Sequence, residues 1–383
     1  MSTTAPKGFR AAGVAAGLKS TGAKDVAVVV NAGPDDAAAA VFTTNRFPAA
    51  PVLWSRQVLT TGRVRAVVLN SGGANACTGA EGFGDTHATA EHAAAELGIG
   101  AIDVAVASTG LIGVRLPMDR LTAGVTAAVK GLSDTGGQDA ALAIMTTDSV
   151  PKTTVVERNG WTVGGMAKGA GMLAPSLATM LVVLTTDAVV DAGTLQTALE
   201  QATSVSFERV DSDGCLSTND TVIVMASGAG GVTPSADEVA EALTAACTDL
   251  AMQLLADAEG STKDVAITVR GAASVEDALT AGRACARNNL LKTALFGNDP
   301  NWGRVLAAIG TTDAAFEPDR VDVTINGVTV CRGGAIGDPR DLVDLTGRAV
   351  TIDVDLGAGT EQATIWTNDL SIAYVHENSA YST

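Results

Sequence analysis

Thr179 is the residue of this sequence whose surroundings most suggest a catalytic role. It follows the glycine-rich segment KGAGMLAPSLA and directly precedes Met180–Leu184, a continuous apolar run typical of a strand buried on both faces. A threonine is an ordinary residue at the start of a strand. A glycine-rich approach with a lysine and a proline could also hold the backbone strained and ready to react. Two interpretations of Thr179 therefore stay open, a buried strand residue and a nucleophile.

A hydroxyl nucleophile needs a base, and histidine is scarce here. Of the three histidines, His87 and His92 fall in a helical segment rich in alanine and glutamate, which predicts solvated side chains rather than a zinc site or a catalytic triad. A chain-terminal α-amine, with a pKa of about 7.7–8.0, suits neutral pH better than a lysine. Thr179 would gain that amine if its hydroxyl attacked the Ala178 carbonyl and water then cleaved the resulting ester.

Composition narrows the class of protein. The chain has 383 residues, 46% hydrophobic and 17% charged, which predicts a compact fold large enough for two domains. A net charge of −17 argues against a nucleic-acid partner. The N-terminus lacks the apolar core of a signal peptide, and no apolar run is expected to reach the roughly 20 residues of a membrane span. Five scattered cysteines without a C-x-x-C favour a reduced, cytoplasmic protein without metal.

Short β-rich runs alternate with alanine-rich helical patterns, so we expect mixed α/β layers around large sheets. Ser235 and Glu238 form a capping box for a helix whose apolar face includes Cys247. Asn326-Gly327 predicts a hairpin turn. The predicted strands are Val26–Asn31, Val64–Asn70, Val104–Ser108, Met180–Thr185, Thr221–Met225, Val265–Val269, Val321–Val330 (with that turn) and Thr351–Leu356.

Several blocks, in order along the chain, resemble one protein family. They are KGAGMLAPSLATML around Thr179, ASTGLIGVRLPM from Ala107, AIMTTDSVPK from Ala143, STNDTV from Ser217, DAEGSTK from Asp257, LLKTALFGNDPNWGR from Leu290 and the tail DLSIAYVHENSAYST from Asp369. From about residue 8 to its end, the chain is similar to the ornithine acetyltransferases, the bifunctional glutamate N-acetyltransferases of arginine biosynthesis. Gly73 in NSGGANACTG and Cys215 in DGCLSTND depart from the family pattern, away from the implied catalytic positions.

The resemblance implies that Thr179 is a nucleophile released by self-cleavage after Ala178. An alpha chain, residues 1–178, and a beta chain, residues 179–383, would result. Thr109 and Gly110 would form the oxyanion hole, from a hydroxyl and a backbone N–H. The implied substrate contacts are Thr147 (favoured over Thr146), Lys168, Thr179, Glu259, Asn378 and Thr383.

The activity implied is ping-pong transfer of acetyl from N2-acetyl-L-ornithine to L-glutamate, with no cofactor and, in some members, with acetyl-CoA as a further donor. The implied fold is a layered α/β sandwich of the N-terminal-nucleophile type with a smaller C-terminal α/β domain. A heterotetramer of two alpha and two beta chains is the implied assembly. The alternatives are a self-processing aminopeptidase, a secondary-metabolism paralogue with another acceptor, and an inactive acidic binding protein.

Overall fold

The computed structural model of the chain describes residues 2–174 and 180–380. They form two compact units. The N-terminal unit comprises the residues up to Glu208 together with Cys215–Leu254, and the C-terminal unit comprises Arg209–Gly214 and the residues from Leu255 onward. The predicted alpha and beta chains are products of a cleavage, and their boundary is not the boundary between these units.

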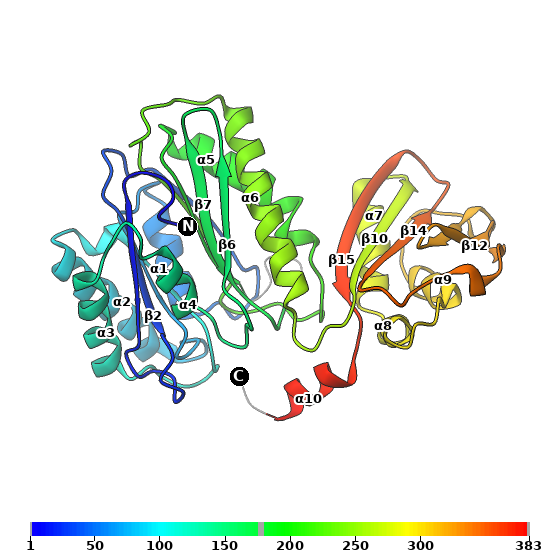
Figure 1. The fold of residues 1–383 in the computed structure, drawn as a ribbon, viewed down its shortest axis with the longest axis horizontal. Helices are drawn as coiled ribbons and strands as arrows, with labels where there is room; N and C mark the ends of the chain where they lie inside the picture. The colour runs from blue at the N-terminus through cyan, green and yellow to red at the C-terminus, as the bar shows by residue number, and fades with distance from the viewer. Residues whose placement is uncertain (1, 175–179, 381–383) are drawn as a thin grey trace. The chain divides into compact units, whose positions relative to one another are not determined.

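One sheet of the N-terminal unit has four strands. Both β4 (Ala66–Asn70) and β5 (Val104–Ser108) are buried along their whole length, and they pair in parallel. This continuous burial explains why both sequences are apolar up to their last residues, Asn70 and Ser108. In spatial order the strands are β1 (Phe9–Val14), β2 (Val26–Asn31), β4 and β5. Strand β2 is labelled in Figure 1.

The second sheet of this unit has five strands and carries the segment that follows Thr179. Strands β8 (Leu181–Thr186) and β9 (Thr221–Ala226) are fully buried and parallel, and their neighbours pair antiparallel. Strand β8 begins one residue later than predicted, at Leu181. The spatial order is β3 (Ala38–Phe42), β9, β8, β7 (Thr162–Lys168) and β6 (Lys152–Glu157).

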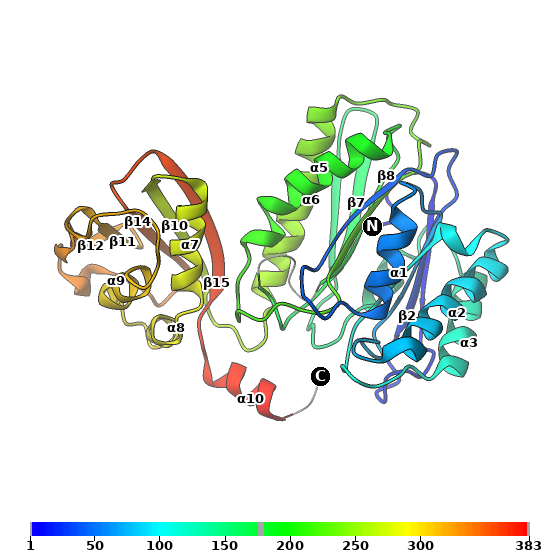
Figure 2. The same cartoon turned by 180° about the vertical axis from the view of Figure 1, so that it is seen from behind.

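Residues of both sheets share one hydrophobic core, built mainly from valine, alanine and leucine. Helices α1 (Ala50–Leu59) and α4 (Gly137–Ala143) contact strands of both sheets. Helices α2 and α3 contact the four-stranded sheet, in which Figure 2 labels β2. Helix α5 contacts β3. The bounds of these three helices are α2 (Gly79–Leu97), α3 (Met118–Lys130) and α5 (Ala192–Ser204).

Helix α6 (Ala236–Ala256) confirms one prediction and corrects another. The Ser235 backbone N–H donates to Glu238 Oε2 at 2.8 Å and the Glu238 N–H donates to Ser235 Oγ at 3.3 Å, as a capping box requires, and Cys247 is buried. Contrary to the sequence analysis, α6 is long and apolar enough to cross a membrane. However, 56% of its apolar window is buried inside the protein, and a core helix passes the same test.

The C-terminal unit contains a six-stranded sheet. Burial alternates along its strand β10 (Asp264–Ala272), so one face of the sheet packs in the core. Helix α7 contacts β10 and β15, and α8 and α9 contact α7. The spatial order is β13 (Ala335–Ile336), β12 (Val328–Arg332), β11 (Asp322–Ile325), β14 (Ala349–Asp355), β10 and β15 (Glu361–Asn368). Its helices are α7 (Val275–Ala286), α8 (Asn289–Phe296), α9 (Trp302–Ile309) and α10 (Ile372–Ala380).

The mixed α/β prediction is confirmed in both units. Each predicted strand has a counterpart, and the predicted turn joins β11 to β12, with φ of +44° at Asn326 and +83° at Gly327. His87 and His92 lie in α2 with partly exposed rings near glutamates, as predicted. Several strands escaped prediction: β1, β3, β6, β7, β13 and β15.

Candidate functional site

The predicted nucleophile Thr179 lies outside the described residues, as do Ala178 and Thr383. The residue after it, Met180, is buried, and its N–H donates to Asp220 Oδ1 at 3.1 Å. Met180 O accepts the N–H of Thr221 at 3.1 Å. In the segment that leads to Thr179, Met172 has a φ of +53°, a left-handed backbone conformation that residues other than glycine rarely adopt. The sequence analysis inferred strain in this approach, and the conformation of Met172 agrees with it.

Thr109 and Gly110, the predicted oxyanion donors, directly follow β5. Thr109 is buried, and its N–H donates to Asn70 O at 3.0 Å. Gly110 has a φ of +129°, and a Cβ at this position would lie 2.9 Å from both the Cα and the N of Gly73. Only glycine fits there, because any side chain would meet backbone atoms as well as an unfavourable φ. The backbone of Gly110 is therefore held against the loop that carries Gly73.

Lys168, a predicted substrate contact, lies beside the oxyanion residues. It is the last residue of β7 and pairs with Leu181 at the start of β8. It is only 2% exposed, and its Nζ donates to Thr109 Oγ1 at 3.2 Å. A hydroxyl that accepts a bond from an ammonium becomes a stronger donor through its own O–H. The Lys168 ammonium therefore polarises the Thr109 hydroxyl, whose O–H can still donate to a developing negative charge.

Asp148 supplies a negative charge near Lys168, and the sequence analysis did not identify it. Its buried carboxylate accepts hydrogen bonds from Lys152 Nζ at 2.7 Å, the Gly169 N–H at 2.7 Å and the Thr146 N–H at 2.9 Å. Burial acts to raise the pKa of this carboxyl, but the charges of Lys168 and Lys152 and the Gly169 bond hold that pKa below its ordinary value. Asp148 is therefore ionised at neutral pH.

Thr147 is half-buried and lies between Thr146 and Asp148 in the chain. The backbone N–H of Thr146 is bonded to the Asp148 carboxylate. Thr147 directly precedes Asp148, whose carboxylate accepts the N–H of Gly169, the residue after Lys168. This places Thr147 in the same region as Lys168. The preference for Thr147 over Thr146 as a substrate contact stays a prediction.

Asp220 is a second carboxyl without a role in the sequence analysis. It is fully buried, and among the described residues its Oδ2 atom has no hydrogen-bond partner. Burial raises the pKa of Asp220 well above its ordinary value, even though the Met180 N–H bond acts in the opposite direction. Burial therefore shifts this carboxyl toward its protonated form, relative to an exposed aspartate. The only sequence signal was its place in the STNDTV block.

In the C-terminal unit, the structure brings together Glu259 and Asn378, two of the predicted substrate contacts. Asn378 Nδ2 donates to Glu259 Oε2 at 3.0 Å and to Tyr374 O at 3.1 Å. The start of α10 packs closely on the turn of Glu259, because a Cβ at Gly260 would lie 2.1 Å from Tyr374 N. Ser371 Oγ donates to Gly260 O at 2.5 Å and accepts the Tyr374 N–H at 3.0 Å.

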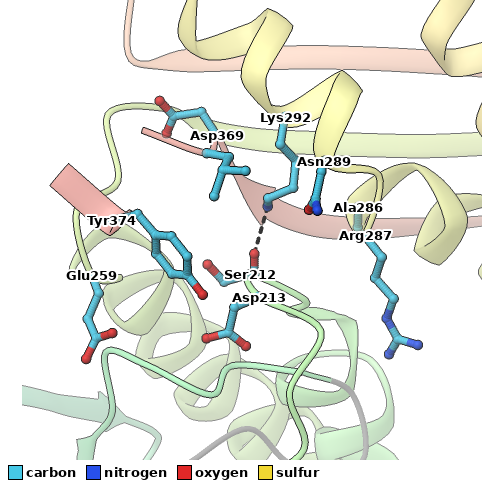
Figure 3. A pocket seen from close by; sticks show the side chains of 10 residues that line it. Ser212, Asp213, Glu259, Ala286, Arg287, Asn289, Lys292, Asp369 and Tyr374 are labelled. Carbon is cyan, nitrogen blue, oxygen red and sulfur yellow. Dashed lines mark hydrogen bonds between the residues drawn. The ribbon is translucent and has the colours of Figure 1, made fainter. Parts of the chain in front are cut away.

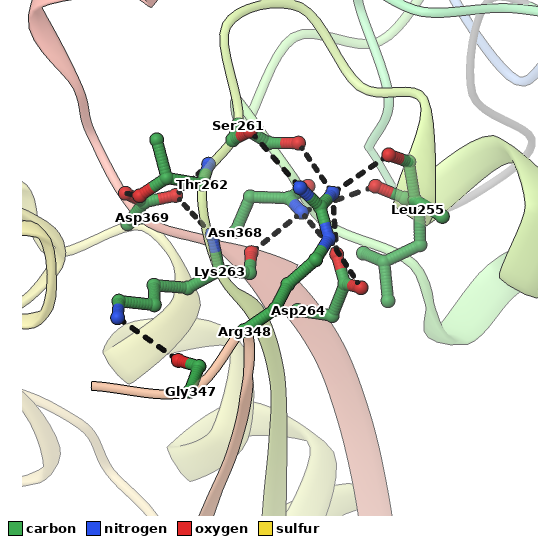
Figure 4. A network of polar contacts seen from close by, with 10 residues as sticks. Leu255, Ser261, Thr262, Lys263, Asp264, Gly347, Arg348, Asn368 and Asp369 are labelled. Carbon is green, nitrogen blue, oxygen red and sulfur yellow. Dashed lines mark hydrogen bonds and ion pairs between the residues drawn. The ribbon is translucent and has the colours of Figure 1, made fainter. Parts of the chain in front are cut away.

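Arg348 bonds to residues before and after the turn that carries Glu259, and Figure 4 shows its contacts with Ser261 and Asp264. Its guanidinium donates to Ala256 O at 2.7 Å, before the turn, and to Ser261 Oγ at 3.0 Å, after it. The same group is bidentate to Asp264, at 2.8 and 3.0 Å. This support fixes the backbone that presents Glu259 and had no signal in the sequence.

A pocket of the C-terminal unit opens beside Glu259 and Tyr374 (Figure 3). Burial lowers the pKa of Lys292 in this pocket to about 8. Its Nζ donates to Ser212 O at 2.7 Å, Thr367 Oγ1 at 2.8 Å and Asn368 O at 2.5 Å, so its three donors are in use. We therefore assign Lys292 a structural role. The lining residues are Ser212, Asp213, Glu259, Ala286, Arg287, Asn289, Lys292, Asp369, Leu370 and Tyr374.

Comparison with known proteins agrees with the resemblance seen in the sequence. The chain is 65% identical over 382 residues to the arginine biosynthesis bifunctional protein ArgJ of Streptomyces avermitilis and 63% identical over 383 residues to that of Thermobifida fusca, with 100% of each chain covered. It is 63% identical to a crystal structure of ornithine acetyltransferase complexed with ornithine from Mycobacterium tuberculosis, which covers 47% of this chain and 96% of that chain, with a TM-score of 0.45. The sequence profile of the ArgJ family matches residues 10–383. This chain belongs to the ArgJ family.

Proposed function

We propose that the protein transfers an acetyl group from N2-acetyl-L-ornithine to L-glutamate in arginine biosynthesis. The observation that carries this is the bond from the buried Lys168 ammonium to Thr109 Oγ1, beside the constrained backbone of Gly110. It gives an oxyanion site with a polarised hydroxyl and a fixed N–H. The full-length relatives named as bifunctional arginine-biosynthesis proteins support the substrates.

The nucleophile in this mechanism is Thr179, freed by cleavage after Ala178. Its α-amine takes the Oγ proton as Oγ attacks the acetyl carbonyl. Thr109 and Gly110 stabilise the tetrahedral oxyanion, which collapses as the ornithine nitrogen takes the proton and leaves. Acetyl-Thr179 remains. The amine of glutamate then attacks this ester, its excess proton passes to the Thr179 Oγ through the α-amine, and N-acetylglutamate is released.

Substrate would be held by charged and polar groups. Lys168 would attract the α-carboxylate of an amino acid, and Glu259 would accept from its cationic end. Asn378, which already contacts Glu259, would orient that carboxylate. Thr147 and Thr383 complete the proposed set. No metal or other cofactor takes part, and acetyl-CoA would serve as a second acetyl donor.

The cleaved chains, residues 1–178 and 179–383, would stay associated, in a heterotetramer of two alpha and two beta chains. A cytoplasmic location fits the proposed pathway. No disulfide joins two cysteines among the described residues, which agrees with a reducing compartment.

The test is a transfer assay with N-acetylornithine labelled in its acetyl group. With glutamate as acceptor, the wild-type protein should release labelled N-acetylglutamate and ornithine in equal amounts, whereas Thr179→Ala should release neither. Labelled acetate without N-acetylglutamate would contradict the proposal and favour the hydrolase. Labelling of a different acceptor would contradict it in favour of a paralogue with another substrate.

A further inference from the structure

Asn219 lies in the connection that leads into β9 and bonds to two separate loops. Its side chain is buried, at 4% exposure. Nδ2 donates to Ala74 O at 2.6 Å and to Ser108 O at 2.7 Å. One amide therefore joins the loop after β4 to the end of β5, the strand that delivers Thr109.

The amide of Asn219 has its orientation locked. Thr218 Oγ1 donates to Asn219 Oδ1 at 2.6 Å, and the Asn219 N–H donates to Ser217 Oγ at 3.1 Å. Both partners of Nδ2 are carbonyl oxygens, which can only accept, so the NH2 group must face them. Each buried polar atom of this side chain is thus satisfied in one arrangement.

The two carbonyls that Asn219 binds lie next in the chain to the residues of the oxyanion site: Ser108 precedes Thr109, and Ala74 follows Gly73, against which Gly110 packs. Ser108 O belongs to the peptide whose nitrogen is that of Thr109, and this N–H is bonded to Asn70 O at 3.0 Å. That peptide is therefore held at both its oxygen and its nitrogen.

We propose that Asn219 is a positioning residue for the acetyl-transfer reaction, fixing the Thr109 hydroxyl and the Gly110 N–H through the two loops it joins. The inference rests on the proposed function. Asp220, its neighbour in the chain, binds the Met180 N–H, one residue after Thr179. The segment Ser217–Asp220 therefore connects the oxyanion residues to the start of the nucleophile's strand.

The test compares Asn219→Asp and Asn219→Ser with wild type in the acetyl-transfer assay. Rates are expressed per active site, counted as acetyl-enzyme formed from labelled N-acetylornithine. Because misplacement of catalytic groups by about 1 Å costs about 100-fold, we expect kcat per active site to fall by about 10- to 100-fold in both variants. KM should stay within about threefold of wild type, since the interaction acts in the transition state.

Asn45→Ala is the matched control. Asn45 Nδ2 donates to Leu216 O at 2.8 Å, so this variant removes an amide–carbonyl bond next to the same segment without touching the oxyanion loops. It should reduce thermal stability but keep wild-type turnover per active site. Wild-type turnover per site in both Asn219 variants would overturn the inference, because a purely structural residue changes only the number of folded sites. A wild-type protein that forms no acetyl-enzyme would instead refute the proposed function itself.

Discussion

The two clusters of candidate functional residues differ in how firmly they are held. Thr109, Lys168 and Asp148 are buried in the N-terminal unit and form charge-assisted bonds with fixed partners. In the C-terminal unit, Asn378 is exposed and Glu259 is half-buried. Stabilising the oxyanion of a transition state needs hydrogen-bond donors that are already in place. Recognition of one end of a substrate tolerates side chains that adjust on binding. We therefore expect the first cluster to serve catalysis, with Lys168 also attracting the substrate α-carboxylate, and the second cluster to serve recognition of the substrate's cationic end.

The largest effect should come from Gly110→Ala. The added Cβ would meet the backbone of Gly73 at 2.9 Å, at a φ of +129°, and would displace the oxyanion N–H. We expect kcat to fall by about 100- to 1,000-fold, the usual cost of losing one such donor. Steady-state kinetics of acetyl transfer measure this.

Gly73→Ala is the control for Gly110→Ala. Among the described residues, a Cβ at position 73 would meet only the flexible side chain of Leu116, with Cδ2 at 3.1 Å and Cγ at 3.9 Å. Its kcat should stay within about threefold of wild type. This also explains how the family can accommodate a larger residue at this position. Equal losses in the two glycine variants would break the assignment of the oxyanion N–H to Gly110.

The next effect concerns the two lysines near Asp148. Lys168→Met removes the ammonium from the Thr109 hydroxyl, and a charge-assisted bond of about 1.5–3 kcal/mol corresponds to about a 10- to 150-fold loss in kcat. Lys152→Met instead breaks the buried ion pair with Asp148, which should cost more stability, about 3–5 kcal/mol. Urea unfolding and kinetics on the same samples separate the two. A greater loss of turnover in Lys152→Met would contradict the role of Lys168.

Variants of the C-terminal cluster should act mainly on substrate affinity. Glu259→Gln and Asn378→Ala should each raise KM for N-acetylornithine by about 2- to 10-fold, the range of one partly exposed hydrogen bond, with little change in kcat. Among the described residues, Ser379→Ala on the same helix removes only a bond to His376 O, and it should leave KM unchanged. A kcat defect in Glu259→Gln without a change in KM would place this cluster in the chemistry instead.

The smallest effect is a pH dependence of stability at Asp220. Its raised pKa means that the folded state keeps a proton that the unfolded state loses above pH about 4, so wild-type stability falls as pH rises toward the folded pKa. Asp220→Asn has no such proton. In the uncleaved Thr179→Ala background, its free energy of unfolding relative to the Asp220 protein should therefore increase from pH 5 to pH 8 in urea titrations. A constant difference would mean that Asp220 is ionised in the fold.

How far the sequence predicts the structure depends on how local the cause is. Apolar runs predict buried strands such as β5 and β9, and the Asn326-Gly327 turn follows from its own two residues. The strands that escaped prediction include β7, whose residues Gly164 and Gly165 are poor strand formers; the structure uses them where Ser2 O and Leu184 Cδ2 come too close for a side chain.

The same distinction holds for the site. The family resemblance singled out Thr109, Lys168, Glu259 and Asn378, and the structure pairs the first two and the last two. Residues that act through long-range contacts had no signal of their own. Asn219 bonds to Ala74 across 145 positions of the chain and to Ser108 across 111. Such a role follows only from the fold.

The most direct test of the central claim is the intact mass of the purified protein under denaturing conditions, before and after addition of N-acetylornithine. We predict two species, residues 1–178 and 179–383, with one acetyl group gained by the second only. That result would establish Thr179 as the nucleophile and N-acetylornithine as the donor together. A single uncleaved mass that gains no acetyl group would contradict the account and leave Thr179 an ordinary threonine.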